Sequence, residues 1–159
     1  MRLDGKTIIV TGSATGIGKA IAKLCVNEGA QVVISDKDGK SAEETVEELG
    51  QEKTIAHIRD LTDEGCPTEL IALAKERFGR IDGLVNNAAF VTWSDIASTE
   101  TDYFKQVLDV NLVAPLALIQ AALPELKRNK GSVVNIGSVN AHCGEPTPVS
   151  YTHLRAHET

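Results

Sequence analysis

Three glycines near the N-terminus have the spacing of a phosphate-binding loop. Gly12, Gly16 and Gly18 lie between a β-branched run at residues 7–10 and a segment with helical periodicity. Glycine adopts backbone angles that other residues avoid, and the free N–H groups at a helix N-terminus attract an anion. The pattern therefore predicts a site for a pyrophosphate, and the alternative is a tight turn that binds nothing.

An acidic residue follows the next apolar run, at residues 32–34. Asp36 lies about 20 residues beyond the glycines, where dinucleotide-binding units place a carboxylate against the ribose hydroxyls. A carboxylate at this point repels a 2′-phosphate, which favours NAD over NADP, although Lys37 beside it leaves NADP open. The alternative role for Asp36 is to cap a turn with Asp38 and Gly39.

The scaffold that must position these residues is predicted by apolar runs that alternate with helical patterns. We expect strands over residues 7–10, 32–34, 54–58, 83–85 and 132–136, and helices from Ile17 to a C-cap at Gly29 and over 41–49, 69–78 and about 102–126. Ser41 and Glu44 predict a capping box. Strands that are apolar throughout indicate a parallel sheet covered on both faces. The fold class is therefore α/β: a doubly wound, Rossmann-like parallel sheet in three αβα layers.

Composition limits the possible partners. The 159 residues suit one domain, and 42% hydrophobic residues argue for a globular chain. With 22 acidic and 16 basic side chains the net charge is −6, so nucleic acid is not an expected partner. No apolar run approaches the roughly 18 residues of a membrane helix, and no signal peptide is recognised.

Cysteines and histidines give no pattern of metal ligands. Cys25, Cys66 and Cys143 lack metal-type spacing and indicate reduced thiols of a cytoplasmic protein. His153 and His157 are four residues apart but lack further ligands, so no metal is expected. His57 is expected to be a strand residue and His142 a residue at a pocket rim, and neither is expected to have a partner.

Two polar residues in the second half could do chemistry. Asn111 stands four residues before Pro115 in the long helical pattern. Because proline has no N–H and pushes against the carbonyl at i−4, the carbonyl oxygen of Asn111 is predicted to be free for water or a ligand, with a packing kink as the alternative. Ser138 follows the last expected strand, at the sheet edge where such folds bind ligands, and is otherwise an ordinary loop residue.

Together these motifs resemble those of the short-chain dehydrogenase/reductase family. Residues 11–18 are similar to its TGxxxGxG cofactor loop, residues 86–88 to its NNAG element, and Asp60 and Leu61 to the pair that contacts adenine. The resemblance extends from Leu3 to about Pro148. It implies an NAD-dependent oxidoreductase that transfers hydride between the nicotinamide and an alcohol or ketone, in a homo-oligomer. The cofactor-binding residues that it implies are Gly12, Ser13, Thr15, Gly16, Ile17, Gly18, Asp36, Asp60, Leu61, Asn87, Ala88 and Ala89, the last in place of the family glycine.

The resemblance also implies the catalytic residues. Asn111 would hold a water in a proton relay, and Ser138 would bind the substrate oxygen. Tyr151, thirteen residues after Ser138, has the spacing of the family's acid or base. A phenol with an ordinary pKa of about 10 needs a neighbouring cation for that role. Arg155 stands where the family has lysine, and it is not an equivalent ribose clamp or proton-relay partner, so we expect impaired catalysis.

The last eleven residues, VSYTHLRAHET, do not resemble the helix start that carries the family's tyrosine and lysine. One reverse translation matches the end of a widely used transposase-based sequencing adapter. We therefore expect residues 1–148 to be a dinucleotide-binding domain that lacks the family's last strands and helices, and residues 149–159 to be an adapter-derived tail. The possibilities are an enzyme lineage whose present chain has little or no activity, a non-catalytic NAD-binding chain, and a fragment that does not fold stably because an apolar strand edge stays open.

The adapter hypothesis predicts the codons of the tail. Residues 149–159 should be encoded by GTC TCT TAT ACA CAT CTC CGA GCC CAC GAG followed by AC. Sequencing the source DNA across codon 148 tests this, and different codons over the tail would contradict the hypothesis.

Overall fold

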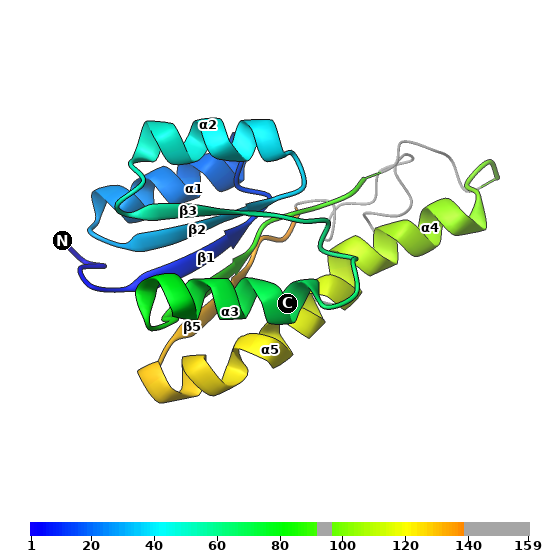
Figure 1. Ribbon diagram of the computed structural model, residues 1–159. Coiled ribbons are helices and arrows are strands. Elements are labelled where there is room, and N and C mark those ends of the chain that lie inside the picture. The colour runs from blue at the N-terminus through cyan, green and yellow to red at the C-terminus, as the bar shows by residue number, and fades with distance from the viewer. Residues whose placement is uncertain (92–96, 139–159) are drawn as a thin grey trace.

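The protein is described by a computed structural model that covers residues 1–91 and 97–138. Five strands form one parallel sheet in the order β3-β2-β1-β4-β5 (Figure 1). The strands are β1 (Thr7–Thr11), β2 (Gln31–Asp36), β3 (Thr54–Ile58), β4 (Gly83–Asn86) and β5 (Ser132–Asn135). The helical segments are α1 (Gly16–Asn27), α2 (Gly39–Leu49), α3 (Cys66–Phe78), α4 (Thr101–Leu108), the π-helical η1 (Asp109–Val113) and α5 (Ala114–Asn129).

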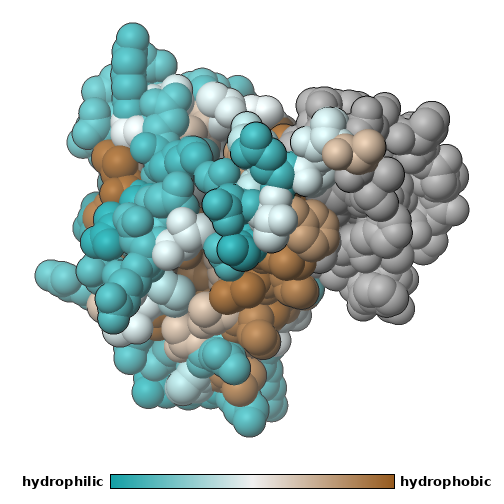
Figure 2. All heavy atoms as spheres, turned by 90° about the vertical axis from the view of Figure 1, so that its right-hand side faces the viewer, coloured by the Kyte–Doolittle hydropathy of each residue, from teal (hydrophilic) through white to brown (hydrophobic). Residues whose placement is uncertain are grey.

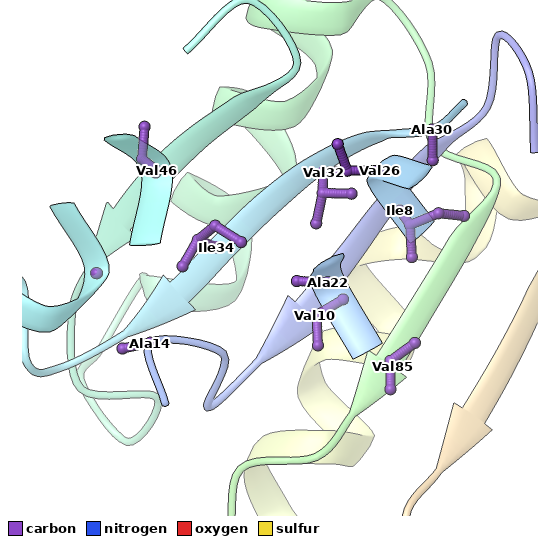
Figure 3. Close-up of a cluster of buried hydrophobic side chains, with 11 residues drawn as sticks. Ile8, Val10, Ala14, Ala22, Val26, Ala30, Val32, Ile34, Val46 and Val85 are labelled. Carbon is purple, nitrogen blue, oxygen red and sulfur yellow. The ribbon is translucent and has the colours of Figure 1, made fainter. Parts of the chain in front are cut away.

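The sheet is the middle of three layers. Helices α1 and α2 cover one face, and α3 and α5 cover the other (Figure 1). On the α1 and α2 side, alternate residues of β1 and β2 pack against both helices, and Figure 3 shows this cluster around Ile8, Val10, Ala22, Val32 and Ile34. The intervening residues Ile9, Val33 and Leu84 pack against α3 and α5. Burial on both faces explains why these strands are apolar throughout, and it confirms the doubly wound α/β fold expected from the sequence.

Two helix starts differ from the sequence expectation. The predicted capping box at Ser41 and Glu44 is wrong, because α2 begins earlier, at Gly39, and Asp38 is its N-cap. The Asp38 carboxylate accepts hydrogen bonds from the N–H and the hydroxyl of Ser41, at 3.2 and 2.6 Å. Helix α3 begins at Cys66 rather than at residue 69, because Pro67 fits the first turn of a helix.

The helix expected over residues 102–126 is a continuous stretch from Thr101 to Asn129 with a π-helical turn inside it. By length and hydropathy alone this stretch could cross a membrane, contrary to the expectation from uninterrupted apolar runs, because mean hydropathy tolerates scattered polar residues. That is weak support for a membrane helix. Leu118, Ala122 and Leu126 of this stretch pack in the core beside α3.

Strand β5 lies at one edge of the sheet and pairs only with β4 within the described residues. Its residues are exposed, including the apolar Val133 and Val134. The outer face of the long helix also exposes Leu112, Val113 and Leu116. Figure 2 shows hydrophobic side chains gathered on the face that looks toward the right of Figure 1. These surfaces contrast with the fully packed strands in the middle of the sheet.

A buried carboxylate holds the amino ends of β1 and β4 together. Asp82 precedes β4, and its side chain accepts hydrogen bonds from the N–H of Thr7, from Lys6 Nζ and from two nitrogens of Arg80, at 2.7–3.1 Å. Burial alone would raise the pKa of Asp82, but these donors together hold the pKa below its usual value. The charged form of Asp82 therefore stabilises the junction between β1 and β4.

We expect Asp82→Asn to lower the free energy of unfolding by about 2 kcal/mol at neutral pH, because the buried N–H of Thr7 and the half-exposed cations of Lys6 and Arg80 lose their charged acceptor. A depressed pKa means that this contribution is present above the ordinary Asp pKa of about 3.9 and is lost as the pH falls through the native pKa. Urea unfolding at several pH values measures the difference between the two proteins, which should shrink in acid. Arg2→Ala, which removes an exposed ion pair with Glu28, is the control and should change little. Equal effects of the two variants would contradict the prediction.

Candidate active site

A cavity of about 400 Å³ lies at the carboxyl edge of the sheet, beside the point where the strand order reverses between β1 and β4. Most of the residues expected to bind a cofactor line it, namely Gly12, Thr15, Asp36, Asp60, Leu61, Asn87, Ala88 and Ala89. The strand order brings these segments together although they are far apart in the sequence. Sequence reasoning noted Lys37 beside Asp36 but missed the other lining residues, which are Ser35, Arg59, Phe90 and Val110.

The floor of the cavity is a close contact between the ends of β1 and β4. Gly12 has φ +61°, and a Cβ atom there would lie 2.8 Å from the Cα atom of Ala88. The hydroxyl oxygen of Thr11 accepts hydrogen bonds from the N–H groups of Asn87 and Ala88, both at 3.1 Å. The side-chain amide of Asn87 donates to the carbonyl oxygens of Thr11 and Gly12, both at 3.0 Å. These bonds fix the NNA segment against the glycine-rich loop.

The backbone N–H groups at the N-terminus of α1 are available to bind an anion. Its N-cap, Thr15, makes no side-chain capping bond within the described residues, and the first turn contains no acidic residue. Gly16 has φ +57°, and the position of its missing Cβ is open space. A helix N-terminus with uncapped N–H groups beside a cavity is a good site for a phosphate group.

The remaining predicted loop residues lie around this helix start rather than in the cavity wall. Ser13 is fully buried, and its hydroxyl donates to the carbonyl oxygen of Val10 at 2.7 Å. Gly18 is buried in the first turn of α1, and Ile17 is exposed. The structure therefore places the Ser13 side chain inside the loop, where it supports the backbone.

Asp36 caps the turn, as one of the two roles considered for it requires, and it also lines the cavity. Its Oδ2 accepts a hydrogen bond from the N–H of Ala14 in the glycine-rich loop, and its Oδ1 accepts one from the N–H of Asp38 in the following turn, both at 3.1 Å. The carboxylate thus caps the turn and also faces the cavity. Each carboxylate oxygen can accept a further hydrogen bond, so these contacts orient Asp36 and leave it able to accept hydrogen bonds from a ligand.

Two cations line the cavity beside Asp36, and both already have acidic partners. Lys37 Nζ lies 3.5 Å from an oxygen of Asp60. Arg59 binds Asp63 and Glu69 at 3.1 and 2.7 Å. Hydrogen bonds from Thr62, with help from Lys37, keep the pKa of Asp60 below its usual value, so Asp60 is ionised at neutral pH.

Asn111 connects the long helix to the cavity. It lies in η1, is 2% exposed, and its side chain makes two hydrogen bonds to the backbone of Phe90: Nδ2 donates to the carbonyl at 2.7 Å, and Oδ1 accepts from the N–H at 2.9 Å. Sequence reasoning did not find this contact. The Ala114 N–H donates to Asp109, five residues back, and Pro115 has no N–H. The carbonyl groups of Val110 and Asn111 therefore both lack their α-helical donors.

The other predicted catalytic residues are placed only in part. Ser138 is half-buried and follows β5 at the same edge of the sheet as the cavity. Tyr151 and Arg155 lie outside the described residues, as do His142, His153 and His157. Within the described ranges no group of three or more His, Cys, Asp or Glu residues could hold a metal ion.

Comparisons with known proteins agree with this geometry. The family model described as short chain dehydrogenase matches residues 6–153. The chain belongs to the short-chain dehydrogenase family. It is 38% identical to L-fucose dehydrogenase of Rattus norvegicus over 154 residues, which cover 94% of this chain and 55% of the relative. It is 37% identical to the Bos taurus protein of that name over 153 residues, with the same shares of each chain covered.

A bacterial relative gives a similar result. An uncharacterized oxidoreductase of Staphylococcus aureus (strain MW2) is 34% identical over 139 residues, 87% of this chain and 60% of the relative. The chain thus spans little more than half the length of the curated relatives that it matches. The family consists of oxidoreductases that typically use nicotinamide cofactors. The uncapped α1 N-terminus, the oriented Asp36 carboxylate and the cavity between them fit such a dinucleotide.

We expect Asn111→Ala to lower the free energy of unfolding by about 2 kcal/mol, because it removes two hydrogen bonds to the partly buried N–H and carbonyl of Phe90. Chemical denaturation measures this effect. The control is Gln106→Ala, an exposed position on α4, which should have little effect. If both variants unfold at the same denaturant concentration as the unchanged chain, the bonds between Asn111 and Phe90 do not support the fold.

Proposed function

We propose that the chain is the NAD-binding part of a dehydrogenase that transfers hydride between the nicotinamide and an alcohol or ketone. The observation that carries this proposal is the pairing of an uncapped helix N-terminus with an oriented carboxylate across one cavity. These are the groups that bind the pyrophosphate and the ribose of a dinucleotide in a doubly wound fold. When bound, the cofactor would supply the hydride acceptor or donor.

The described residues suggest how each part of the cofactor would be held. The N–H groups of Gly16, Ile17 and Gly18 at the α1 N-terminus would bind the pyrophosphate, and Thr15 lies beside them. Asp36 would accept hydrogen bonds from the adenosine ribose. The adenine would lie along the wall formed by Asp60, Leu61 and Val110, and the other ribose near Asn87, Ala88 and Ala89.

The charges around Asp36 favour NAD over NADP. A 2′-phosphate needs a cation that is free to bind it, but Lys37 is paired with Asp60, and Arg59 with Asp63 and Glu69. Asp36 itself would repel the phosphate. Binding of NADP would therefore require Lys37 or Arg59 to leave a carboxylate, and this cost supports NAD as the cofactor.

For the whole protein we propose that Asn111 holds a water through its backbone carbonyl and that Ser138 binds the substrate oxygen. Tyr151 has the spacing of the acid or base, and Arg155 in place of a lysine supports a chain with little or no turnover. The mammalian relatives are named L-fucose dehydrogenase, so a sugar hydroxyl is the first substrate class to test. Purified chain with NAD and L-fucose should show no enzyme-like rate, and a rapid turnover would contradict this proposal.

We also propose a contact between copies of the parent enzyme and a cytoplasmic location. The exposed apolar side chains of Leu112, Val113 and Leu116 support a contact with a second copy of the parent enzyme. Cys25 and Cys66 are free thiols, and burial raises the pKa of Cys66 to about 11, which suits a cytoplasmic protein with reduced, unreactive cysteines.

We also propose that residues 149–159 are an adapter-derived tail and that residues 1–148 are the truncated dinucleotide-binding domain.

We expect Asp36→Asn to lower the affinity for NAD about tenfold, the factor typical of losing a hydrogen bond to a charged acceptor. Its affinity for NADP should rise relative to NAD, because the repulsion of the 2′-phosphate is removed. Calorimetric titration with both cofactors gives the ratio of the two dissociation constants, which is insensitive to any general loosening of the loop. Glu43→Gln removes an exposed acidic charge from α2 and is the control. An unchanged ratio for Asp36→Asn would contradict the assignment of Asp36 to the ribose.

A further inference from the structure

Buried polar groups connect β2 with the inner side of the glycine-rich loop. The N–H of Ser35 donates to Ser13 Oγ at 3.2 Å, and the N–H of Ser13 donates to the carbonyl oxygen of Ser35 at 3.3 Å. Ser13 Oγ in turn donates to the carbonyl oxygen of Val10. Both serines are fully buried. The loop therefore depends on Ser35 for the position of its first residues after β1.

A histidine supports Ser35 from the neighbouring strand. His57 of β3 is directly opposite Ser35 in the sheet, and its Nδ1 lies 3.3 Å from Ser35 Oγ. The imidazole is 5% exposed, and Ser35 lines the cavity. The sequence expectation that His57 is a strand residue is confirmed, but the expectation that it has no partner is wrong. Its partner is 22 residues away in the sequence, and only the strand register brings the two together.

The burial of the other ring nitrogen indicates which tautomer is present. Nε2 of His57 is buried and has no hydrogen-bond partner within residues 1–91 and 97–138. A buried N–H without an acceptor is rarer than a buried acceptor without a donor. The proton of the neutral ring therefore belongs on Nδ1, which donates it to Ser35 Oγ.

We propose that His57 is a positioning residue for the dinucleotide: its neutral ring holds Ser35, Ser35 holds Ser13, and the glycine-rich loop stays in the shape that receives the pyrophosphate. This role rests on the proposed function of the cavity. A second proton on the ring would place a charge and an unpaired N–H donor inside the protein, so the ring would have to leave Ser35 to reach water.

The charged groups around the His57 ring do not reverse its preference for the neutral form. Burial lowers the pKa of His57, Glu69 on α3 raises it, and Arg59 after β3 lowers it again, with a net decrease. Glu69 is already paired with Arg59. Cys66, at the start of α3, remains a neutral thiol because burial raises its pKa to about 11. On β2 the polar partner of the ring is the hydroxyl of Ser35.

The sign of the pH effect follows from the lowered pKa. An exposed histidine has a pKa of about 6.5, so the ordered loop gains its full support from neutral His57 above that pH. The support is lost as the pH falls through the lower pKa of the folded protein. Affinity for the dinucleotide should therefore fall in mild acid, above the range in which Asp60, whose pKa is lowered, loses its charge.

The experiment uses ADP-ribose, which carries the part of the cofactor that the described residues would hold and which lacks the nicotinamide. We measure its dissociation constant by calorimetry as the pH is lowered from about 7.5, past the ordinary histidine pKa of about 6.5 and through the lower pKa of His57. The unchanged chain should lose affinity by about fivefold, the factor that one neutral hydrogen bond is worth. His57→Gln keeps a group that can bind Ser35 but does not titrate, so it should retain most of the affinity and show no such pH dependence.

A second variant and a second measurement separate the possible outcomes. His57→Val should bind ADP-ribose weakly at every pH, and hydrogen exchange at the Ser13 and Ala14 amides should become faster, while Ile58→Val on the same strand leaves both unchanged. A pH dependence that persists in His57→Gln, or unchanged exchange in His57→Val, would overturn the inference and leave the proposed function standing. If the unchanged chain does not bind ADP-ribose at any pH, both the inference and the proposed function are wrong.

Discussion

The site depends on how closely the backbones at the ends of β1 and β4 approach each other. Gly12 lies so near Ala88 that a side chain would collide with it, and the bonds between Thr11 and Asn87 hold the two segments at that distance. This contact sets where α1 begins and therefore where its free N–H groups point. It occurs at the reversal of strand order, the one place in a doubly wound sheet where the following helices diverge and leave a crevice.

The fold could be predicted because its determinants are local in the sequence. Apolar runs such as residues 32–34 are explained by burial on both faces, and the glycines at 12, 16 and 18 by positive φ angles or close backbone contacts between a strand and a helix. Helix ends were less predictable, since several nearby residues can cap. Ser41 and Asp38 are both good N-cap types, and the fold uses Asp38 because Asp36 binds its N–H and fixes the turn before α2.

The candidate site could be predicted as a set of strand-end residues, but the direction of each side chain could not. Ser13 belongs to the predicted loop, yet its hydroxyl points inward to Val10. Lys37 and Arg59 enter the cavity wall with carboxylates already bound, and His57 meets Ser35 through strand register alone. Apart from the local bond between Ser13 and Val10, these contacts join segments that are far apart in the sequence. Composition and spacing carry no information about them until the sheet has been assembled.

The π-helical turn shows how one local irregularity serves a distant wall of the cavity. In an α-helix, the extra residue within η1 would not exist, and Asn111 would face a different direction. The added residue shifts the Ala114 N–H to Asp109 and Pro115 has no N–H, so the carbonyl groups of Val110 and Asn111 both lose their α-helical donors, which is a cost to the helix backbone. The same turn places the buried side-chain amide of Asn111 where it binds both polar groups of the Phe90 backbone. Because Phe90 lines the cavity and directly continues the NNAA segment, the helix and the glycine-rich loop constrain the same wall from opposite ends.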